Sequence, residues 1–180
     1  METAIPDLVT LRPLDEELLS ALLATAVAEA DPREVMPPTE EDGPAGWTEP
    51  RREAFLRFHR SRSLGPEPAE DVYAVVVAET GETGRVEETV AGAARLVPGP
   101  EPDTVEAGLW LGRSYRGRGV GTAVFARLVE TARESGAARL FARTSTANAA
   151  TRRMLTAAGA EPERHQDGTV TAWLTLRRPA

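Results

Sequence analysis

The chain has 180 residues, 41% of them hydrophobic, and this size and composition predict one domain over residues 1–180 with a sizeable core. The absence of cysteine excludes disulfides, thiolate metal sites and cysteine nucleophiles, and two histidines are too few for a His-rich centre, so we expect no metal. No apolar run approaches the ~20 residues of a membrane span, and the first residues lack signal-peptide features, so we expect a cytoplasmic protein with no membrane partner.

The net charge of −7 is unevenly distributed along the chain. Residues 1–111 contain 23 acidic residues and 9 arginines, whereas residues 112–155 contain 9 arginines and 2 acidic residues. The basic segment favours an anionic ligand. The overall acidity and the lack of interleaved aromatic residues argue against a nucleic-acid partner, which we do not expect.

The N-terminal part of the chain predicts a strand, two helices and three further strands. Leucines at helical spacing, β-rich runs and clusters of proline and glycine mark these elements. In order, we expect a strand at 9–12, a helix at 15–30, a loop at 31–49, a helix at 53–62, and an antiparallel meander of strands at 71–79, 90–97 and 104–111.

The C-terminal part predicts two helices that alternate with strands. Gly136 and Gly159 would end the helices, since glycine is common just past a helix C-terminus. In order, we expect a helix from 120 to 136, a strand at 139–144, a helix that Asn148 caps and Gly159 ends, and a hairpin over 165–176 with Asp167 and Gly168 at its turn.

The segment 109–122 is the most informative part of the chain. An apolar strand runs into a turn with glycines at 117, 119 and 121, and an amphipathic helix follows immediately. Glycines let a bulky ligand approach the backbone, and the first helical turn offers unpaired N–H groups at the positive end of the helix dipole. The segment therefore predicts a cradle for a phosphate-bearing ligand.

Two familiar phosphate-binding motifs do not fit this segment. A dinucleotide fingerprint needs a third glycine where Thr122 stands, and an acidic residue about 20 positions further on, where none occurs. A P-loop needs a lysine, and this chain contains none. What is left is Arg116-x-x-Gly119-x-Gly121, which resembles the acyl-CoA pyrophosphate loop of the GNAT superfamily of N-acetyltransferases.

Two further features extend the resemblance to most of the chain. Residues 148–160 look like the family's N-x-x-[SA]-x-x-x-[YL]-x-x-x-G-[FA] element, and the expected order of strands and helices is that of a GNAT fold. Leu155 stands where many members have a tyrosine that protonates the leaving thiolate. Together with Asn148 and Thr151, this leucine resembles the Rim-type branch, which acetylates protein N-termini.

The resemblance implies an α/β (α+β) fold with a mixed, mostly antiparallel twisted sheet of six to seven strands and about four flanking helices. It also implies transfer of an acetyl group from acetyl-CoA to a primary amine of a small molecule or a protein N-terminus, by direct attack on the thioester. A homodimer is possible, as dimers are frequent in the superfamily. The alternatives are a non-catalytic acyl-CoA-binding regulatory module and an anion-binding or nucleic-acid-binding protein.

The resemblance also assigns the residues that contact acetyl-CoA. Main-chain groups at the strand end would pair with the pantetheine, an N–H near Leu111 would serve as oxyanion donor, and the loop amides would bind the pyrophosphate. Asn148 and Thr151 would contact the CoA arm, although a helix cap and first-turn position explain them equally well. The assigned residues are Leu109, Trp110, Leu111, Arg116, Gly117, Arg118, Gly119, Val120, Gly121, Thr122, Asn148 and Thr151.

Glu106 is the candidate general base, because members that use a carboxylate base have it at nearly this distance before the loop. Burial among apolar neighbours would raise the pKa of a glutamate there toward a useful range. A solvated glutamate, a water relay to Glu70 or Asp71, or no dedicated base remain open.

Trp47 and Tyr73 are the candidate acceptor contacts. The carboxylates near Trp47 would favour a cationic amine, or they form an ordinary charged loop. We expect His59 to be a surface or core histidine rather than a base. The carboxylates are Glu34, Glu40, Glu41, Asp42 and Glu49.

Overall fold

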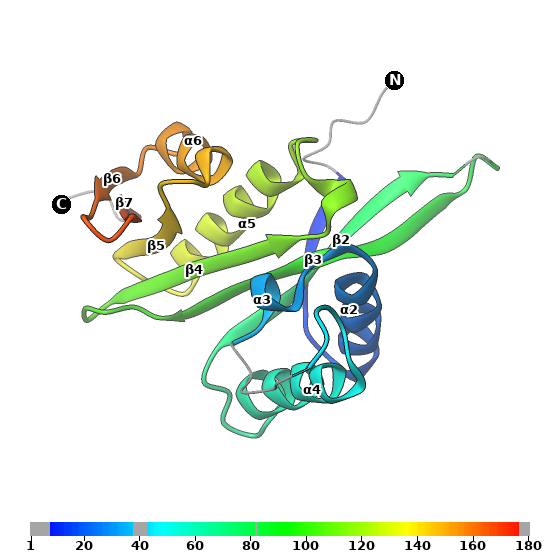
Figure 1. Cartoon of the computed structure of the whole chain (residues 1–180). Coiled ribbons are helices and arrows are strands. Elements are labelled where there is room, and N and C mark those ends of the chain that lie inside the picture. Colours follow the sequence, from blue (N-terminus) through cyan, green and yellow to red (C-terminus); the bar gives the residue numbers. More distant parts are fainter. Residues whose placement is uncertain (1–7, 38–42, 82, 177–180) are drawn as a thin grey trace.

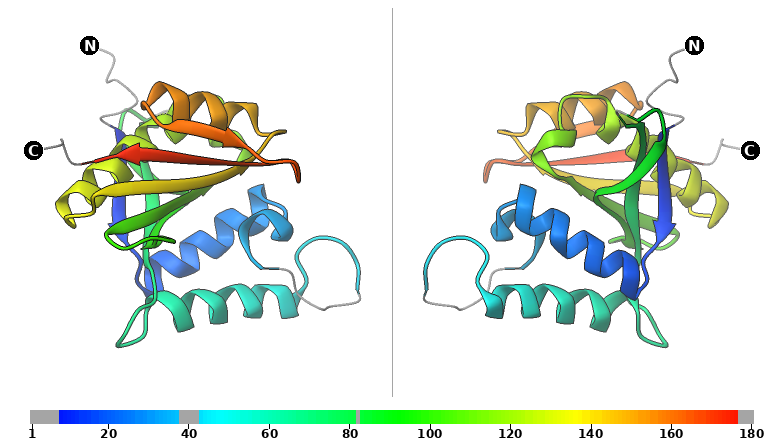
Figure 2. Two further views of the ribbon diagram at one scale, coloured as in Figure 1. Left: turned by 90° about the vertical axis from the view of Figure 1, so that its left-hand side faces the viewer. Right: turned by 90° about the vertical axis from the view of Figure 1, so that its right-hand side faces the viewer.

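The computed structural model describes residues 8–37, 43–81 and 83–176, which form a seven-stranded sheet with helices on both faces. Figure 1 shows α5 and α6 on one side of the sheet and α2, α3 and α4 on the other, and Figure 2 confirms these three layers from two further directions. The predicted GNAT-type sheet is confirmed. The described residues contain five α-helices, one more than the approximate number predicted.

Eleven of the thirteen elements in the described residues follow the predicted order, and the two additional ones are a short helix and a 3₁₀ turn. Along the chain the elements are β1 (Val9–Pro13), α2 (Glu16–Glu29), α3 (Pro32–Val35), α4 (Glu49–Ser63), β2 (Asp71–Thr80), β3 (Val86–Pro98), β4 (Thr104–Leu111), the 3₁₀ turn η1 (Arg113–Tyr115), α5 (Val120–Glu134), β5 (Arg139–Ser145), α6 (Ala149–Ala157), β6 (Glu161–Arg164) and β7 (Thr169–Thr175). Among the described residues, no helix has the length and apolar character needed to cross a membrane.

The sheet opens between β4 and β5, and this opening positions the site. The strand order is β1-β2-β3-β4-β5-β7-β6, and every neighbouring pair is antiparallel except β4 and β5. The parallel pairing of β4 with β5 ends at Ala107 and Ala142, although β4 continues to Leu111 and β5 to Ser145. The carboxyl ends of the two strands therefore separate.

Each face of the sheet has its own hydrophobic core. Val124 and Leu128 of α5 pack on one face, and Leu22 of α2 packs with Phe55 of α4 on the other. Side chains alternate along a strand, so the open end of β4 contributes to both cores. Leu109 and Leu111 join the α5 side, and Trp110 joins the α2 and α4 side.

The predicted loop over 31–49 is wrong in part, because it contains α3 and the start of α4. Asp31 caps α3 by accepting the N–H of Arg33 at 2.9 Å, and Thr48 caps α4, which begins four residues earlier than predicted. Both helices carry a proline in the first turn. A proline there needs no N–H partner, so it marks a helix start as well as a loop.

The predicted start of the C-terminal hairpin, at residue 165, is four residues too late. Its first arm is β6, Glu161–Arg164, and the N–H of His165 donates to the carbonyl oxygen of Thr169 at 2.9 Å to close the turn. All four residues of β6 are exposed. An exposed polar edge strand has no hydrophobic alternation, so its sequence pattern gives no signal.

A bulge in β3 sets the position of the open end of β4. The register between β2 and β3 shifts between Val75 and Val76. On the other edge of β3, Gly92 pairs with Leu111 of β4. A Cβ on Gly92 would lie 2.1 Å from the carbonyl oxygen of Trp110. The two backbones approach so closely that only glycine fits there.

We predict that Gly92→Ala lowers the free energy of unfolding by at least about 2 kcal/mol, because the new methyl group collides with backbone rather than with a movable side chain. Gly65→Ala is the matched control, since a Cβ there has no heavy atom within 4 Å. Urea denaturation of both variants checks the prediction. Equal stability of the two variants would contradict it.

Candidate active site

The open end of β4 presents main-chain groups that β5 does not pair with. The N–H of Gly112 donates to the carbonyl oxygen of Ala91 at 2.8 Å, so the Gly112 amide faces β3. Main-chain groups alternate between the two edges of a strand, so Leu109 and Leu111 direct theirs toward the gap between β4 and β5. Arg116 Nε donates to the carbonyl oxygen of Leu111 at 2.9 Å from that side.

The glycine turn leads into a helix start with free amides. Gly119 is the N-cap of α5 with φ 83°, and it offers no side-chain cap to the first turn. Gly117 also has a positive φ, of 70°. Because the first-turn N–H groups of a helix have no intrahelical partner, the amides of Val120, Gly121 and Thr122 are available to an anion.

A groove of about 760 Å³ joins the strand opening to the helix start. Every residue predicted to contact acetyl-CoA lines it except Arg118 and Val120. Asn148 caps α6 by accepting the N–H of Thr151 at 3.1 Å, so these two residues fill a structural role and also line the groove. The other lining residues are Glu34, Ser145, Ala147, Ala150 and Met154.

Glu29, at the end of α2, anchors the turn that precedes the glycines. Its carboxylate accepts the N–H of Ser114 at 2.8 Å and the Ser114 hydroxyl at 2.7 Å. These bonds, the backbone one above all, hold the pKa of Glu29 below its ordinary value. A Cβ on Gly112 would lie 2.9 Å from Glu29 Oε2, so the glycine makes room for the carboxylate.

Carboxylates from the N-terminal part of the chain also pair with the loop arginines. Arg116 Nη2 donates to Glu34 Oε2 at 3.0 Å, and Arg118 forms an ion pair with Glu79. The hydroxyl groups of Tyr115 and Thr89 lie 2.9 Å apart. The loop is therefore held by α2, α3, β2 and β3, and neither of the chain's two tyrosines lines the groove.

A second cavity, of about 310 Å³, lies on the opposite face of the open end of β4. Residues on or next to α3, α4, β2, β3 and β4 line it, on the side of the sheet where α3 and α4 lie. Glu34, Leu109 and Trp110 line both this cavity and the groove. The two cavities therefore meet at the point where β4 leaves β5.

A buried carboxylate with two guanidinium partners lies in the wall of the second cavity. The Glu70 side chain is 1% exposed, forms an ion pair with Arg62, and accepts from Arg95 Nη1 at 3.1 Å. Arg95 extends over Gly108 of β4, where a Cβ would lie 3.0 Å from its Nε. Sequence reasoning missed Arg95, although a single arginine within an apolar strand was a usable signal.

His59 of α4 also lines the second cavity. It is 5% exposed, and neither ring nitrogen has a hydrogen-bond partner among the described residues. The rings of Phe55 and Phe58 hold it, with centroids 4.6 Å and 5.3 Å away. Burial lowers the pKa of His59 to about 4, so its ring is neutral at pH 7. The structure places His59 in the core, which is one of the two positions expected for it.

Glu106 lies half-buried on β4, opposite Val97 of β3. By strand alternation its side chain belongs to the same face as Gly108 and Trp110, which line the second cavity. Glu106 is absent from the linings of both cavities. Glu106 therefore belongs to the strand face that borders the second cavity, and its role as a general base stays a prediction.

The two candidate acceptor contacts lie apart from the second cavity. The indole N–H of Trp47 donates to the carbonyl oxygen of Ala30 at 2.9 Å, and its ring packs edge-on against Phe55. Tyr73 packs on the α5 face of the sheet. Neither lines a cavity described above, so both stay predictions. Of the nearby carboxylates, Glu34 lines both cavities, and Glu40, Glu41 and Asp42 lie outside the described residues.

Residues 9–161 match the model of the acetyltransferase (GNAT) domain family. The chain belongs to the GNAT acetyltransferase family. No curated protein matches its sequence. Among the described residues, no group of three or more His, Asp or Glu side chains could hold a metal ion.

Solved structures share this GNAT fold over almost the whole chain. One is yncA from Salmonella typhimurium with its cofactor acetyl-CoA, with a TM-score of 0.62, 20% identity, and coverage of 96% of each chain. The spermidine/spermine N-acetyltransferase SpeG from Vibrio cholerae gives 0.63 at 12% identity, covering 94% of this chain and 95% of that one. An N-acetyltransferase from Staphylococcus aureus Mu50 gives 0.58 at 19% identity, with 94% and 99% covered.

We predict that Glu29→Gln weakens acetyl-CoA binding about 5-fold to 10-fold, because the neutral amide holds the Ser114 turn less firmly and the glycine loop loses its preorganisation. Calorimetric titration with acetyl-CoA measures the change. Glu17→Gln, on an exposed face of α2, is the matched control. An unchanged affinity in Glu29→Gln would show that the loop needs no such anchor.

We predict that the wild type loses about 2 kcal/mol of unfolding free energy through His59 between pH 7 and pH 5. The folded-state pKa of about 4 is below the unfolded value, so the unfolded chain takes up a proton that the folded chain does not. This contribution is full above the unfolded pKa and is lost as the pH falls toward 4. His59→Phe lacks this part of the pH dependence, which urea denaturation at both pH values tests. Equal losses in both proteins would contradict the account.

Proposed function

We propose that the chain transfers an acetyl group from acetyl-CoA to a primary amine of a small molecule or a protein N-terminus. The observation that carries this proposal is that two cavities meet at the open end of β4. One contains an anion cradle, and the other has polar side chains among its apolar walls. Two reactants held on opposite sides of one strand end are held close together, which is the main requirement of a direct transfer. Family membership and the acetyl-CoA in the yncA structure support the choice of donor.

The groove residues fit the chemical groups of acetyl-CoA. The first-turn amides of α5, from Val120 to Thr122, would bind the pyrophosphate. The outward main-chain groups of Leu109 and Leu111 would pair with the amides of the pantetheine arm. The N–H of Leu111 would also stabilise the charge that develops on the carbonyl oxygen.

Bound acetyl-CoA would supply a thioester carbonyl that a neutral amine attacks directly. The N–C bond forms first, the C–S bond then breaks, and the CoA thiolate leaves and takes up the proton that the attacking nitrogen loses. The chain's own part is to orient the amine, to remove its extra proton and to donate to the oxyanion. Glu106 takes that proton in this proposal, since it lies on the acceptor face of β4 two residues before Gly108. Leu155, at 1% exposure, is a core residue, so it supplies no general acid.

The Rim-type branch also remains part of this proposal. It is supported by Leu155 with Asn148 and Thr151, which line the opening between β4 and β5. This branch would give a protein N-terminus as the acceptor. Comparing short peptides with free small amines as acceptors tests it, and turnover of small amines alone would remove it.

We predict that Gly121→Val weakens acetyl-CoA binding at least about 10-fold, because the branched side chain would occupy the groove next to the first-turn amides. Gly121 has an ordinary φ, and a Cβ there would lie 3.6 Å from Leu111 Cδ1, so the fold tolerates the change. Gly65→Val is the control. Calorimetric titration with acetyl-CoA gives the affinities, and undiminished binding in Gly121→Val would place the ligand elsewhere.

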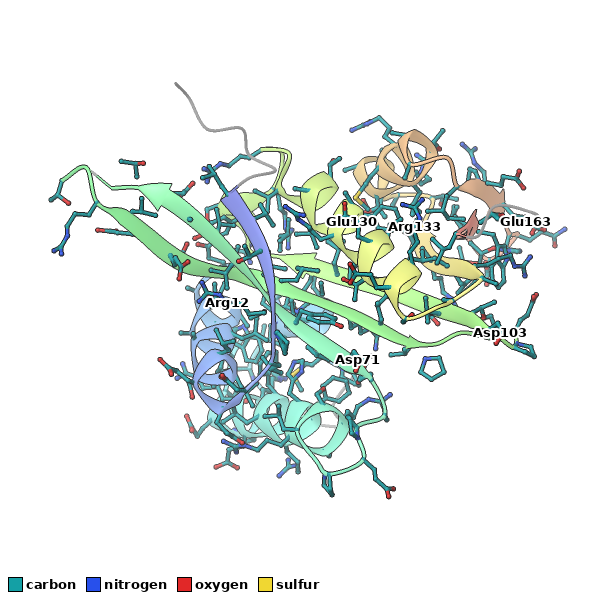
Figure 3. The ribbon with its side chains drawn as sticks, turned by 180° about the vertical axis from the view of Figure 1, so that it is seen from behind. Arg12, Asp71, Asp103, Glu130, Arg133 and Glu163 are labelled. Carbon is teal, nitrogen blue, oxygen red and sulfur yellow. The ribbon has the colours of Figure 1, made fainter. Side chains whose placement is uncertain are left out.

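We predict that Glu106→Gln lowers kcat/KM about 100-fold while acetyl-CoA affinity stays within about twofold, because the amide cannot accept the ammonium proton. Glu163→Gln on the exposed edge strand β6 is the matched control, and Figure 3 labels its position. Thiol release from acetyl-CoA measures the rate. Full activity in Glu106→Gln would favour a relay or no dedicated base. Binding by the wild type without turnover of any amine would favour the non-catalytic module.

A further inference from the structure

Arg95 and Glu70, which line the second cavity, belong to a cluster of charged side chains with one excess positive charge. Glu70 neutralises only one of its two guanidinium partners, so the group formed by Arg62, Glu70 and Arg95 has a net charge of +1. Glu70 and Glu34 are the only carboxylates among the described residues that line the cavity. An arginine side chain has five N–H donors, and Glu70 uses one donor of Arg95. The remaining donors are available to an anionic group in the cavity.

His59 adds an unused hydrogen-bonding group to the same cavity. A buried polar group without a partner is rare in a folded protein, because it costs about 1–3 kcal/mol to leave it unpaired. Both ring nitrogens of His59 are buried and unpartnered among the described residues, and two phenylalanine rings fix the imidazole in place. The neutral ring can donate one hydrogen bond and accept another. A ligand in the cavity would satisfy it.

At its junction with the groove the cavity presents a carboxylate, Glu34, which also accepts from Arg116. Glu34 lines both cavities there, together with Leu109 and Trp110. Arg95 extends over Gly108, which precedes Trp110 by two residues, or about 7 Å along β4. A carboxylate and a guanidinium in the wall of one small cavity match a small molecule that carries both an ammonium group and an anionic group.

The size and the remaining walls narrow the ligand further. A volume of about 310 Å³ is at the lower end of the range for small-molecule sites, about 300–1,000 Å³. Met36, Phe58 and Val72 provide apolar walls. These features suit a compact ligand with one apolar substituent.

We propose that the second cavity binds the acceptor as a free α-amino acid with an apolar side chain. Its carboxylate is held by Arg95 and by His59 as a hydrogen-bond donor, and its amine lies at the junction beside Glu34. Glu70 is a positioning residue that fixes Arg95. This inference rests on the proposed acetyl transfer. A polyamine has no anionic group, and a peptide N-terminus has an amide carbonyl in place of the carboxylate, so either would leave the net positive charge of the Arg62, Glu70 and Arg95 cluster unmatched.

The test compares L-methionine, L-leucine and L-phenylalanine with their carboxamides, which differ from them only in the charged group. We expect kcat/KM for the acids to exceed that for the amides about 100-fold in the wild type, because an amide leaves the buried donors poorly matched. In Arg95→Gln this preference falls to about threefold or less. Arg12→Gln, which breaks a surface pair with Glu88, is the matched control. Figure 3 labels Arg12 on β1.

The His59 variants separate recognition from a structural role. His59→Phe raises KM for the acids about 10-fold and leaves kcat within about threefold, and His59→Gln, which can still donate and accept, restores part of the loss. The carboxamides show no such pattern. Equal KM values for acids in all three proteins would remove His59 from the site.

Direct binding distinguishes this inference from the proposed function. Titrations of L-methionine and of acetyl-CoA are carried out separately, with circular dichroism to confirm that Arg95→Gln is folded. Acetyl-CoA binding together with equal turnover of acids and amides, or of spermidine instead, overturns the amino-acid inference and leaves the acetyltransferase standing. Arg95-dependent binding of L-methionine without acetyl-CoA binding supports the cavity and overturns the transfer. Failure of every amino acid to bind overturns the inference, whether or not acetyl-CoA binds.

Discussion

The separation of β4 from β5 is the constraint on which the rest of the structure depends. A sheet normally satisfies every main-chain group of its inner strands, yet the pairing here ends at Ala107 while β4 continues to Leu111. The open end is stable because each face has a hydrophobic core of its own, and because the close approach of Gly92 fixes β4 against β3. The result is an inner strand with a free edge, which can hold one reactant along the edge and another on its face.

The uneven distribution of charge along the chain has a structural explanation. Three of the nine arginines of the basic segment pair with acidic residues from the N-terminal part. The pairs are Arg116 with Glu34, Arg118 with Glu79, and Arg139 with Glu101. Exposed pairs of this kind contribute about 0–1 kcal/mol each, so their role here is to place the loop rather than to stabilise the fold. The anion cradle itself is made of backbone amides, and the neighbouring carboxylates place the loop that carries them.

Most of the residues predicted to contact acetyl-CoA line one groove, because the sequence signal for them is local. Strand, glycine turn and helix follow one another in 109–122, so the cradle could be derived without knowledge of the tertiary fold. The second cavity assembles α3, α4 and three strands, and its key residues are far apart in the sequence. Arg95 is positioned by its hydrogen bond to Glu70 and by the space that Gly108 leaves without a Cβ. No sequence pattern indicates either feature. The first arm of the C-terminal hairpin, β6, was predicted to start too late, and the proline-started α3 was missed, because apolar periodicity marks neither element.

The account claims that acetyl-CoA binds along the open edge of β4 and at the first turn of α5. Hydrogen–deuterium exchange with and without acetyl-CoA measures this most directly, since it reports on the amides that would form the contacts. The account predicts increased protection confined to residues 109–122 and to the start of α6 near Asn148. Saturating acetyl-CoA that leaves the amides of Leu111, Gly121 and Thr122 unprotected, or protects a different surface, would contradict it.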